Sequence, residues 1–424
     1  MNLTQQTPQV KKKLVKTLKT SQKLKKIMAW YFIKGKIYST LPWKHTAWST
    51  SGFPTEFLWA YDVYPFLPEN CATIAAARRK SQELIEYAEA CGFCRDLCSY
   101  FKTNIGAYDA KLPAQFGGLE KPDLMTCTNT VCDTHVKWFQ IQSRKMNVPL
   151  FVWDIPAYVS GSDEKVMNRY LDYITDQFWE FTDFIYDVTG KKFNRNSFIK
   201  TIKKADELAV LWRELFEYRK QIPAPLGYAD TLGDVFPMFA LPGVNKGIKF
   251  YRELVEEVKE AAKLGKGVVE NEKFRLLFEG IPFWYKIKFF HQLADFGAVV
   301  TYEPYTWSFG VRREIIDNDI DKSLREMAKS LIHTPYWYNL ETRIEYFKKV
   351  IDEYKIDGVI LHNNLSCRPS TTTMADLKQV LQDELDIPVL LLTCDMNDPR
   401  AFSEASMQTR LESFIELLES RGRK

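Results

Sequence analysis

Residues 123–155 read DLMTCTNTVCDTHVKWFQIQSRKMNVPLFVWDI, and this stretch decides the fold class. Two short apolar runs, Asp123–Cys127 and Leu150–Ile155, have the length of β-strands. Between them, the pattern of Thr134–Met146 favours an α-helix. A strand, a helix and a second strand at this spacing predict a right-handed unit in which the two strands are parallel.

The same alternation continues on both sides of this unit. Upstream, the pattern predicts a short strand at Thr46–Ser51 and a helix at Ala75–Ala90, so we assign residues 45–160 to a first α/β domain. Downstream, residues 273–424 form a second α/β domain. Its candidate strands and its closing helix are Phe274–Phe278, Ala298–Tyr302, Gly358–His362, Val389–Thr393 and Glu404–Glu419.

A helical segment, residues 161–272, separates the two domains. Its apolar residues recur at spacings of four, three, four, three and four, which places them on one face of a helix, and Gly190 fits the C-terminal stop. These residues are Met167, Leu171, Ile174, Phe178, Phe181 and Ile185. We interpret them as packing residues. The expected fold is therefore α/β, with two Rossmann-like parallel-sheet domains, this helical middle segment and a basic helical N-terminal arm.

The N-terminal arm, residues 1–44, differs in charge from the rest of the chain. Residues 1–55 hold eleven of the 58 Lys and Arg, and the first of the 54 acidic residues is Glu56. The arm is expected to be a solvated amphipathic helix or a frayed tail, with docking to an acidic partner or a membrane surface as the alternative. Eight of its lysines alternate with apolar residues: Lys11, Lys12, Lys13, Lys16, Lys19, Lys23, Lys25 and Lys26.

Composition excludes several classes of protein. The chain has 424 residues, 46% hydrophobic and 26% charged, which is ordinary for a globular protein with several cores. No apolar run approaches the ~18 residues of a membrane-spanning helix. The apolar stretch Ile27–Ile33 is broken by Lys34 and lacks the features of a signal peptide, so a cytoplasmic protein is expected. One basic arm is not the basic face that nucleic-acid binding requires.

The eight cysteines carry the strongest chemical signal. In a cytoplasmic protein they do not form a disulfide framework. Cys127 and Cys394 end predicted strands, and Cys132 and Cys367 lie in turns that follow strands. Because open α/β sheets bind ligands at the carboxyl ends of their strands, cysteines of both domains are expected to converge on one crevice.

Thiolates in such positions suit a soft metal or an iron–sulfur cluster. The spacing of Cys91, Cys94 and Cys98 is suggestive, but it is neither the ferredoxin run nor a pair of zinc-binding C-x2-C motifs. Taken singly, each cysteine, Cys71 included, is more typical of a small buried residue. At this point a metal site and ordinary packing both stay open.

The histidines and the remaining motifs add less. His135 lies three residues after Cys132 and His362 ends a predicted strand, but an ordinary surface or packed histidine is favoured at each position. The same holds for His45, His291 and His333. The chain contains no GxGxxG fingerprint, P-loop, GxSxG elbow or HExxH motif. We therefore do not expect it to hydrolyse ATP itself.

Short segments along the chain, in this order, match those of a known enzyme family. They are Trp48-Ser-Thr-Ser51, Pro68-Glu-Asn70, Asp96-Leu-Cys98 with Lys102-Thr-Asn104 and Gly106, Cys132 with Lys137-Trp138, Asn147-Val-Pro149, Glu279-Gly-Ile-Pro282, Asp357-Gly358 leading to Ser366-Cys367, Asp398-Pro-Arg400, and Thr409-Arg410. They cover roughly Ala47 to Leu417. The chain resembles the 2-hydroxyacyl-CoA dehydratase and benzoyl-CoA reductase family, specifically the subunit with the substrate-side iron–sulfur cluster.

The resemblance implies a cofactor and its ligands. Family members hold one [4Fe-4S] cluster with three cysteines, which by motif position correspond to Cys98, Cys132 and Cys367, and one iron stays open for water or the thioester oxygen. Ser51 matches a serine near the cluster, and Glu69 matches a glutamate of the same pocket that is a candidate for proton handling. The structural alternatives are a turn or cap for Ser51 and a helix N-terminal carboxylate for Glu69.

The resemblance also implies a reaction and partners. A separate homodimeric iron–sulfur ATPase delivers one low-potential electron with ATP hydrolysis, and the acyl-CoA thioester becomes a ketyl radical anion. In dehydratases this radical expels the 2-hydroxyl group and a β-proton is then lost. The electron is recovered from the resulting radical anion, and a 2-enoyl-CoA leaves. Arg400 is a candidate for orienting a loop or for binding a CoA phosphate. These enzymes are usually heterodimers, so a second homologous subunit is expected, with a homodimer as the alternative.

Other functions stay open beside the dehydratase, which the Trp-Ser-Thr-Ser segment favours. A benzoyl-CoA reductase subunit would reduce an aromatic ring with the same cluster ligands. A non-catalytic electron-relay subunit would not need Ser51 and Glu69, which are both present. A zinc-binding structural protein would contain no sulfide. A double-cubane cluster is disfavoured because Glu279-Gly-Ile-Pro282 stands where its Gly-Cys-Pro motif is expected.

Overall fold

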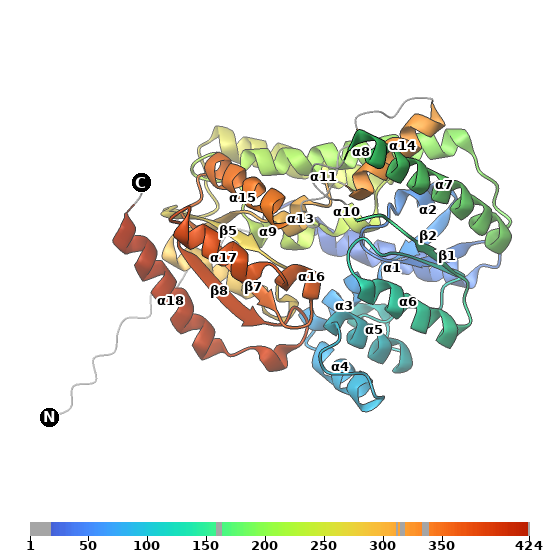
Figure 1. Cartoon of the computed structure of the whole chain (residues 1–424), viewed down its shortest axis with the longest axis horizontal. Helices are drawn as coiled ribbons and strands as arrows, with labels where there is room; N and C mark the ends of the chain where they lie inside the picture. Colours follow the sequence, from blue (N-terminus) through green and yellow to red (C-terminus); the bar gives the residue numbers. More distant parts are fainter. Residues whose placement is uncertain (1–17, 158–162, 311–312, 314–318, 333–338, 423–424) are drawn as a thin grey trace.

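The computed structural model describes residues 18–157, 163–310, 313, 319–332 and 339–422. It contains two four-stranded sheets, and every strand pairing in them is parallel. Figure 1 shows the sheets in two lobes, with the long helices of the middle segment above them. The expected α/β fold with two parallel sheets is confirmed.

The first sheet has the strand order β2-β1-β3-β4. Its strands are β1 (His45–Ser49), β2 (Val63–Phe66), β3 (Leu124–Thr128) and β4 (Leu150–Trp153). The flanking helices are α1 (Leu24–Thr40), α2 (Glu56–Ala60), α3 (Pro68–Ala77), α4 (Ser81–Ala90), α5 (Ser99–Asp109) and α6 (Asp133–Met146), with 3-10 turns η1 (Ser21–Lys23) and η2 (Ala114–Phe116). The strand–helix–strand unit β3–α6–β4 follows the prediction from residues 123–155.

Two details of this first region differ from the sequence prediction. The helix predicted over Ala75–Ala90 is wrong, because the chain breaks into α3 and α4 at Arg79, which adopts a positive φ of 58°. The strand β2 was not predicted. It has four residues and contains Pro65, which an edge strand such as β2 tolerates.

The N-terminal arm is partly packed. Helix α1 buries Ile27, Tyr31 and Tyr38, so this part is not the free solvated helix that the lysine pattern suggests. Tyr31 contacts the rings of Tyr64 and Phe66, which lie on β2. Lys11, Lys12, Lys13 and Lys16 lie outside the described residues, as does His333.

The middle segment supplies five helices: α7 (Glu164–Thr189), α8 (Arg195–Tyr218), α9 (Tyr228–Asp234), α10 (Phe236–Ala240) and α11 (Asn245–Lys263). The predicted apolar face of α7 is confirmed, since Leu171, Ile174, Phe178, Phe181 and Ile185 are buried. Gly190 closes α7 in the left-handed conformation, as predicted.

The second sheet repeats the topology of the first, with the order β6-β5-β7-β8. Its strands are β5 (Phe274–Glu279), β6 (Ala298–Tyr302), β7 (Gly358–Asn364) and β8 (Val389–Cys394). Its helices are α12 (Lys288–Gln292), α13 (Pro304–Trp307), α14 (Ile320–Ile332), α15 (Leu340–Tyr354), α16 (Arg368–Thr371), α17 (Met374–Asp383) and α18 (Glu404–Arg421), with 3-10 turns η3 (Trp284–Lys286), η4 (Leu293–Phe296) and η6 (Pro399–Ala401). All four predicted strands are present.

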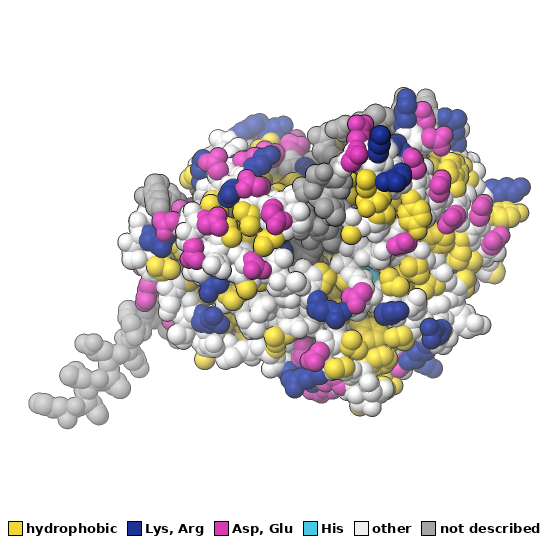
Figure 2. Space-filling model, viewed as in Figure 1, with side chains coloured by type: hydrophobic (Ala, Val, Ile, Leu, Met, Phe, Trp, Pro, Cys, Tyr) yellow, Lys and Arg dark blue, Asp and Glu magenta, His cyan; other side chains and the backbone are white. Residues whose placement is uncertain are grey.

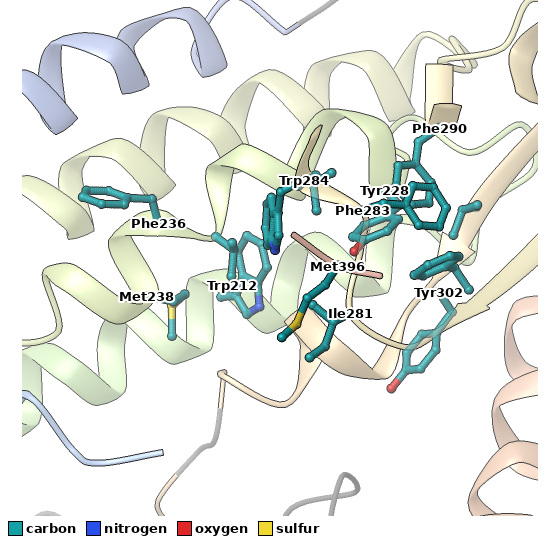
Figure 3. Packing of buried hydrophobic residues seen from close by; sticks show 14 of the residues in the cluster. Trp212, Tyr228, Phe236, Met238, Ile281, Phe283, Trp284, Phe290, Tyr302 and Met396 are labelled. Carbon is teal, nitrogen blue, oxygen red and sulfur yellow. The ribbon is translucent and has the colours of Figure 1, made fainter. Parts of the chain in front are cut away.

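One large apolar core joins the parts. It combines Trp212 of α8 and Tyr228 of α9 with Phe283, Trp284 and Tyr302 of the second region, as Figure 3 shows. A second core lies around α7 and includes residues of α14, which reaches back to the first sheet. On the face drawn in Figure 2, Lys and Arg side chains are interspersed with Asp and Glu. Within the described residues, no helix is both long and apolar enough to cross a membrane.

Candidate functional site

The carboxyl ends of the two sheets meet, and the predicted site residues lie there. In a parallel sheet of this order, the loops after the two central strands border the topological switch point, where such folds bind ligands. Ser51 follows β1, and Cys132 follows the neighbouring β3. Cys367 follows β7, the equivalent strand of the second sheet.

Direct contacts hold the two sheet ends together. The Ser99 backbone N–H donates to the Ser366 hydroxyl at 3.2 Å, and the two serine hydroxyls lie 3.1 Å apart. Arg368 donates to the Asp133 carboxylate at 2.7 Å. The three cysteine loops therefore belong to one junction, although they are far apart in the sequence.

Each of the three predicted ligand cysteines occupies the N-cap position of a helix. Cys98 precedes α5, Cys132 precedes α6 and Cys367 precedes α16. Burial raises the pKa of Cys132 to about 11 and that of Cys367 to about 12. Burial also raises the pKa of Cys98, and the neighbouring Cys132 and Cys367 raise it further, so the three thiols are close enough to interact.

Backbone N–H groups oppose this effect at each sulfur. The N–H groups of Tyr100 and Phe101 lower the pKa of Cys98. The N–H groups of Thr134 and His135 lower the pKa of Cys132, and the N–H group of Ser370 lowers the pKa of Cys367. Such donors stabilise sulfur in its thiolate form, which is the form that binds metals.

The three thiols fit a cluster better than a single ion. Among the described residues, no group of three or more His, Cys, Asp or Glu side chains is arranged around one metal ion. In an iron–sulfur cubane each cysteine binds a different iron, so the thiolate sulfurs stand farther apart than around one ion. Cys98, Cys132 and Cys367 are half-buried, their thiols influence one another, and backbone N–H groups face their sulfurs, so these residues are suited to hold such a cluster.

Ser51 and Glu69 form a compact polar group with His135. The Glu69 Oε1 atom accepts from the Ser51 backbone N–H at 2.8 Å and from the Ser51 hydroxyl at 3.1 Å, and it lies 3.1 Å from His135 Nε2. Burial raises the pKa of Glu69, but the His135 side chain and the Ser51 N–H outweigh this effect and leave the pKa below its ordinary value. Glu69 is therefore an ionised, buried carboxylate.

Two atoms of this group point to a ligand. Within the described part of the chain, Glu69 Oε2 and His135 Nδ1 are buried and have no hydrogen-bond partner. Buried polar atoms in native proteins almost always have a partner, so an orphaned pair indicates a place for a bound molecule or water. The sequence reasoning missed His135 as a site residue, although its position three residues after Cys132 was a usable signal.

Aromatic residues of the second region close the site. Burial raises the pKa of Tyr305, and the nearby Glu69 and Cys367 raise it further, so Tyr305 lies between the two halves of the site. Tyr305 hydrogen-bonds to Tyr100, whose hydroxyl also accepts from Trp284 Nε1. No sequence pattern pointed to these three residues.

Two of the other cysteines, Cys71 and Cys127, lie near the site, since burial and then the neighbouring Glu69 raise the pKa of each thiol. Cys71 and Cys127 are buried, and Cys91 and Cys94 are exposed. Cys394 is buried beside His362, with Sγ 3.2 Å from Nε2, and burial raises its pKa to about 12.

A charged cluster anchors the Cys98 loop. Buried Lys102 donates to the Arg95 carbonyl and pairs with Glu89 at 2.8 Å. Glu89 also binds Arg400, which in turn pairs with Asp398. Arg400 therefore orients the loop that contains Asp398, which is one of the two roles predicted for it. It also connects the second region to α4 through Glu89.

Comparisons with known proteins identify the family. The profile of the family described as 2-hydroxyglutaryl-CoA dehydratase, D-component, matches residues 50–418. The chain is 32% identical to the (R)-2-hydroxyisocaproyl-CoA dehydratase alpha subunit of Clostridioides difficile, over 88% of this chain and 90% of that protein. It is 29% identical to the (R)-phenyllactyl-CoA dehydratase alpha subunit of Clostridium sporogenes, over 88% and 89%.

A relative with a different reaction also matches. The chain is 27% identical to a benzoyl-CoA reductase subunit of Thauera aromatica, over 86% of this chain and 87% of that protein. The expected family resemblance is thereby confirmed, and with it the expectation of an enzyme. The chain belongs to the 2-hydroxyglutaryl-CoA dehydratase D-component family, whose relatives named here are 2-hydroxyacyl-CoA dehydratases and a benzoyl-CoA reductase.

Proposed function

We propose that this chain is the catalytic subunit of an ATP-activated radical 2-hydroxyacyl-CoA dehydratase, which eliminates water from a 2-hydroxyacyl-CoA. The observation that carries the proposal is the junction of the two sheets, where Ser51, Glu69 and His135 lie beside a group of three N-cap cysteines. Dehydratase alpha subunits among the relatives support it.

Cys98, Cys132 and Cys367 would hold a [4Fe-4S] cluster. When bound, such a cluster supplies a low-potential electron and one iron without a cysteine ligand for the thioester oxygen. The chain's own residues do the remaining work. Tyr100, Trp284 and Tyr305 are packed around the site and exclude water, which a reactive radical requires.

Glu69 has the properties of a positioned proton acceptor. Its Oε1 is fixed by Ser51 and His135, while Oε2 has no hydrogen-bond partner among the residues that the structure describes and would be available to a proton of the substrate. The Ser51 hydroxyl contacts Glu69 at 3.1 Å and would therefore lie beside an acyl group bound at this carboxylate. Loss of a proton from the β-carbon and departure of the 2-hydroxyl group both need such a proton-handling group.

The proposal includes partners. Both dehydratase relatives are named as alpha subunits, and the reductase relative is likewise named as one subunit of its enzyme. We propose a second homologous subunit, and a separate iron–sulfur ATPase as the electron donor.

Metal analysis under anaerobic conditions tests the cofactor. We expect about four iron and four acid-labile sulfide per chain for one cubane. Cys98→Ser, Cys132→Ser and Cys367→Ser each lose most of this iron, whereas the exposed Cys91→Ser retains it. A chain without iron or sulfide after reconstitution contradicts the radical mechanism, and about eight of each would indicate a double cubane.

Substrate assays with the ATPase donor test the reaction. Turnover of 2-hydroxyacyl-CoA and not of benzoyl-CoA is expected. If only benzoyl-CoA is consumed, the chain is a reductase subunit, as the Thauera relative suggests. If Ser51→Ala and Glu69→Gln both leave turnover unchanged, the chain is an electron relay.

A further inference from the structure

A cavity of about 110 Å³ is lined by Ser51 and by residues from several other parts of the chain. One wall is the loop from Ser51 to Glu56. The others are formed by α8 with Ala205 and Ala209, by α10, and by Phe309 after α13. Because the Ser51 hydroxyl also contacts Glu69, the cavity starts where the reacting end of a substrate is expected.

The polar groups of the cavity wall are mostly occupied. The hydroxyl of Thr55 donates to the Phe239 carbonyl at 2.9 Å, and that of Ser308 to the Tyr305 carbonyl at 2.8 Å. The hydroxyl of Ser330 likewise donates to a carbonyl of its own helix at 2.7 Å. The remaining surface is largely apolar.

One ion pair belongs to the described part of the wall. Arg313 and Glu56 lie 2.5 Å apart, with side chains 10% and 4% exposed. Their charges compensate each other, and one donor, Arg313 Nε, lacks a hydrogen-bond partner among the described residues. An additional carboxylate would lose its hydration here and would approach Glu56 as a like charge.

The size of the cavity sets a second limit. A closed apolar protein cavity of about 150 Å³ holds benzene. The cavity described here is partly open to solvent, and in the same proportion its 110 Å³ covers about four carbon atoms of a bound chain. The space exists because α8 presents two alanines one turn apart, both buried.

We propose that this cavity binds the acyl side chain of the substrate and selects an uncharged aliphatic side chain of about four carbon atoms. Ala205 and Ala209 determine the size limit, and the Glu56–Arg313 pair disfavours a terminal carboxylate. The inference rests on the proposed dehydratase function and adds the substrate class to it.

A substrate series tests the selection. The complete enzyme, loaded with its cluster and supplied with its electron donor, is assayed with 2-hydroxyisocaproyl-CoA, lactoyl-CoA, 2-hydroxyglutaryl-CoA and phenyllactyl-CoA. We expect the highest kcat/KM for 2-hydroxyisocaproyl-CoA, by about 10-fold or more over the methyl and the carboxylate side chains. A highest value for 2-hydroxyglutaryl-CoA would overturn the inference, since Arg313 would then recognise the carboxylate.

A cavity-filling variant tests the residues. Ala209→Leu is expected to lower the ratio of kcat/KM for 2-hydroxyisocaproyl-CoA to that for lactoyl-CoA by about 10- to 200-fold. The control is Ala405→Leu, the same change at an exposed position of α18. An unchanged ratio in Ala209→Leu would show that the side chain binds elsewhere.

Binding separates this inference from the proposed reaction. Isocaproyl-CoA and glutaryl-CoA lack the 2-hydroxyl group and cannot be dehydrated, so their affinities are measured by calorimetry on the cluster-loaded protein. Tighter binding of isocaproyl-CoA, lost in Ala209→Leu, supports the cavity assignment even if no hydroxyacyl-CoA is turned over. Equal affinities for the two thioesters overturn it, whatever the activity.

Discussion

The two sheets have the same strand order, yet their carboxyl ends carry different chemistry. Cys132 after β3 and Cys367 after β7 occupy equivalent positions, and each caps the next helix. The positions after the first strand of each half are not equivalent in chemistry. Ser51 follows β1, whereas β5 ends in the buried Glu279.

The carboxylates of the two halves show what this difference means. Both Glu69 and Glu279 are buried. The pKa of Glu69 is below its ordinary value, because His135 and Ser51 outweigh the effect of burial. Burial raises the pKa of Glu279 above its ordinary value despite its ion pair with buried Arg343. The first half thus contains an ionised carboxylate beside Ser51 and His135, whereas the carboxylate of the second half is paired with Arg343 inside the fold.

Exchange of each carboxylate for an amide gives the largest expected effects. Glu69→Gln should lower kcat by roughly 100- to 1,000-fold, as for loss of a proton-handling group, and should lower the free energy of unfolding by only about 1–2 kcal/mol through its contacts with Ser51 and His135. Glu279→Gln should lower the free energy of unfolding by about 3–5 kcal/mol, because Arg343 then stays buried without a charge partner. Steady-state kinetics and urea denaturation measure the two effects.

The opposite result for either variant would contradict the roles assigned to the two carboxylates. If Glu279→Gln folds with wild-type stability and loses activity, the second half also contributes directly to the chemistry. If Glu69→Gln unfolds the protein, Glu69 is a structural carboxylate at a helix N-terminus, as its second-position placement in α3 allows.

Replacement of one glycine in each half is expected to have smaller effects on stability. A Cβ on Gly106 of α5 would lie 2.4 Å from the Leu84 backbone oxygen of α4, which cannot move alone. A Cβ on Gly358 of β7 would lie 2.8 Å from the ring edge of Phe414 on α18, which is a side chain that can shift. Gly106→Ala should therefore cost about 1–3 kcal/mol of stability, and Gly358→Ala less.

Because α5 begins after Cys98, Gly106→Ala should also lower the iron content of the purified protein, and Gly358→Ala should not. Thermal unfolding and iron analysis on the same samples decide this. If both variants lose the same stability and the same amount of iron, the two close contacts tolerate an added methyl group equally well, and the expected difference is wrong.

The ion-pair cluster between the halves gives the smallest effect, and it depends on pH. Arg400 and Lys102 lower the pKa of Glu89 from an ordinary 4.5 to about 2. A carboxylate with a lowered pKa contributes stability above pH 4.5, and this contribution is lost as the pH falls from 4.5 to 2. Glu89→Gln should cost about 1–2 kcal/mol at pH 7 and progressively less below pH 4.5.

Urea denaturation at pH 7, 5 and 3.5 measures this dependence. The control is Glu83→Gln on the same helix, where an exposed pair with Lys80 should contribute less than about 1 kcal/mol. A difference between wild type and Glu89→Gln that does not shrink at low pH would show that the charge of Glu89 is not what joins the halves.

From the sequence alone, most of the local structure and the enzyme family could be predicted. Apolar periodicity predicted the strands of the second sheet and the buried face of α7, because a period reports which side of an element is buried. It also placed Cys132 and Cys367 after strands, where parallel sheets bind ligands. The resemblance selected Cys98, Cys132 and Cys367, and those are the thiols that the structure brings close enough to interact.

Only the tertiary structure decided how the site is assembled. The contact of His135 with Glu69, the place of Tyr305 between the two halves and the cavity beside Ala209 join segments that are far apart in the chain. Local patterns carry no record of such contacts, because each depends on how the ends of two separate sheets and a helix pack together. Spacing along the chain therefore indicated which loops carry candidate site residues, and the packing of the two halves decided which of these residues are in contact.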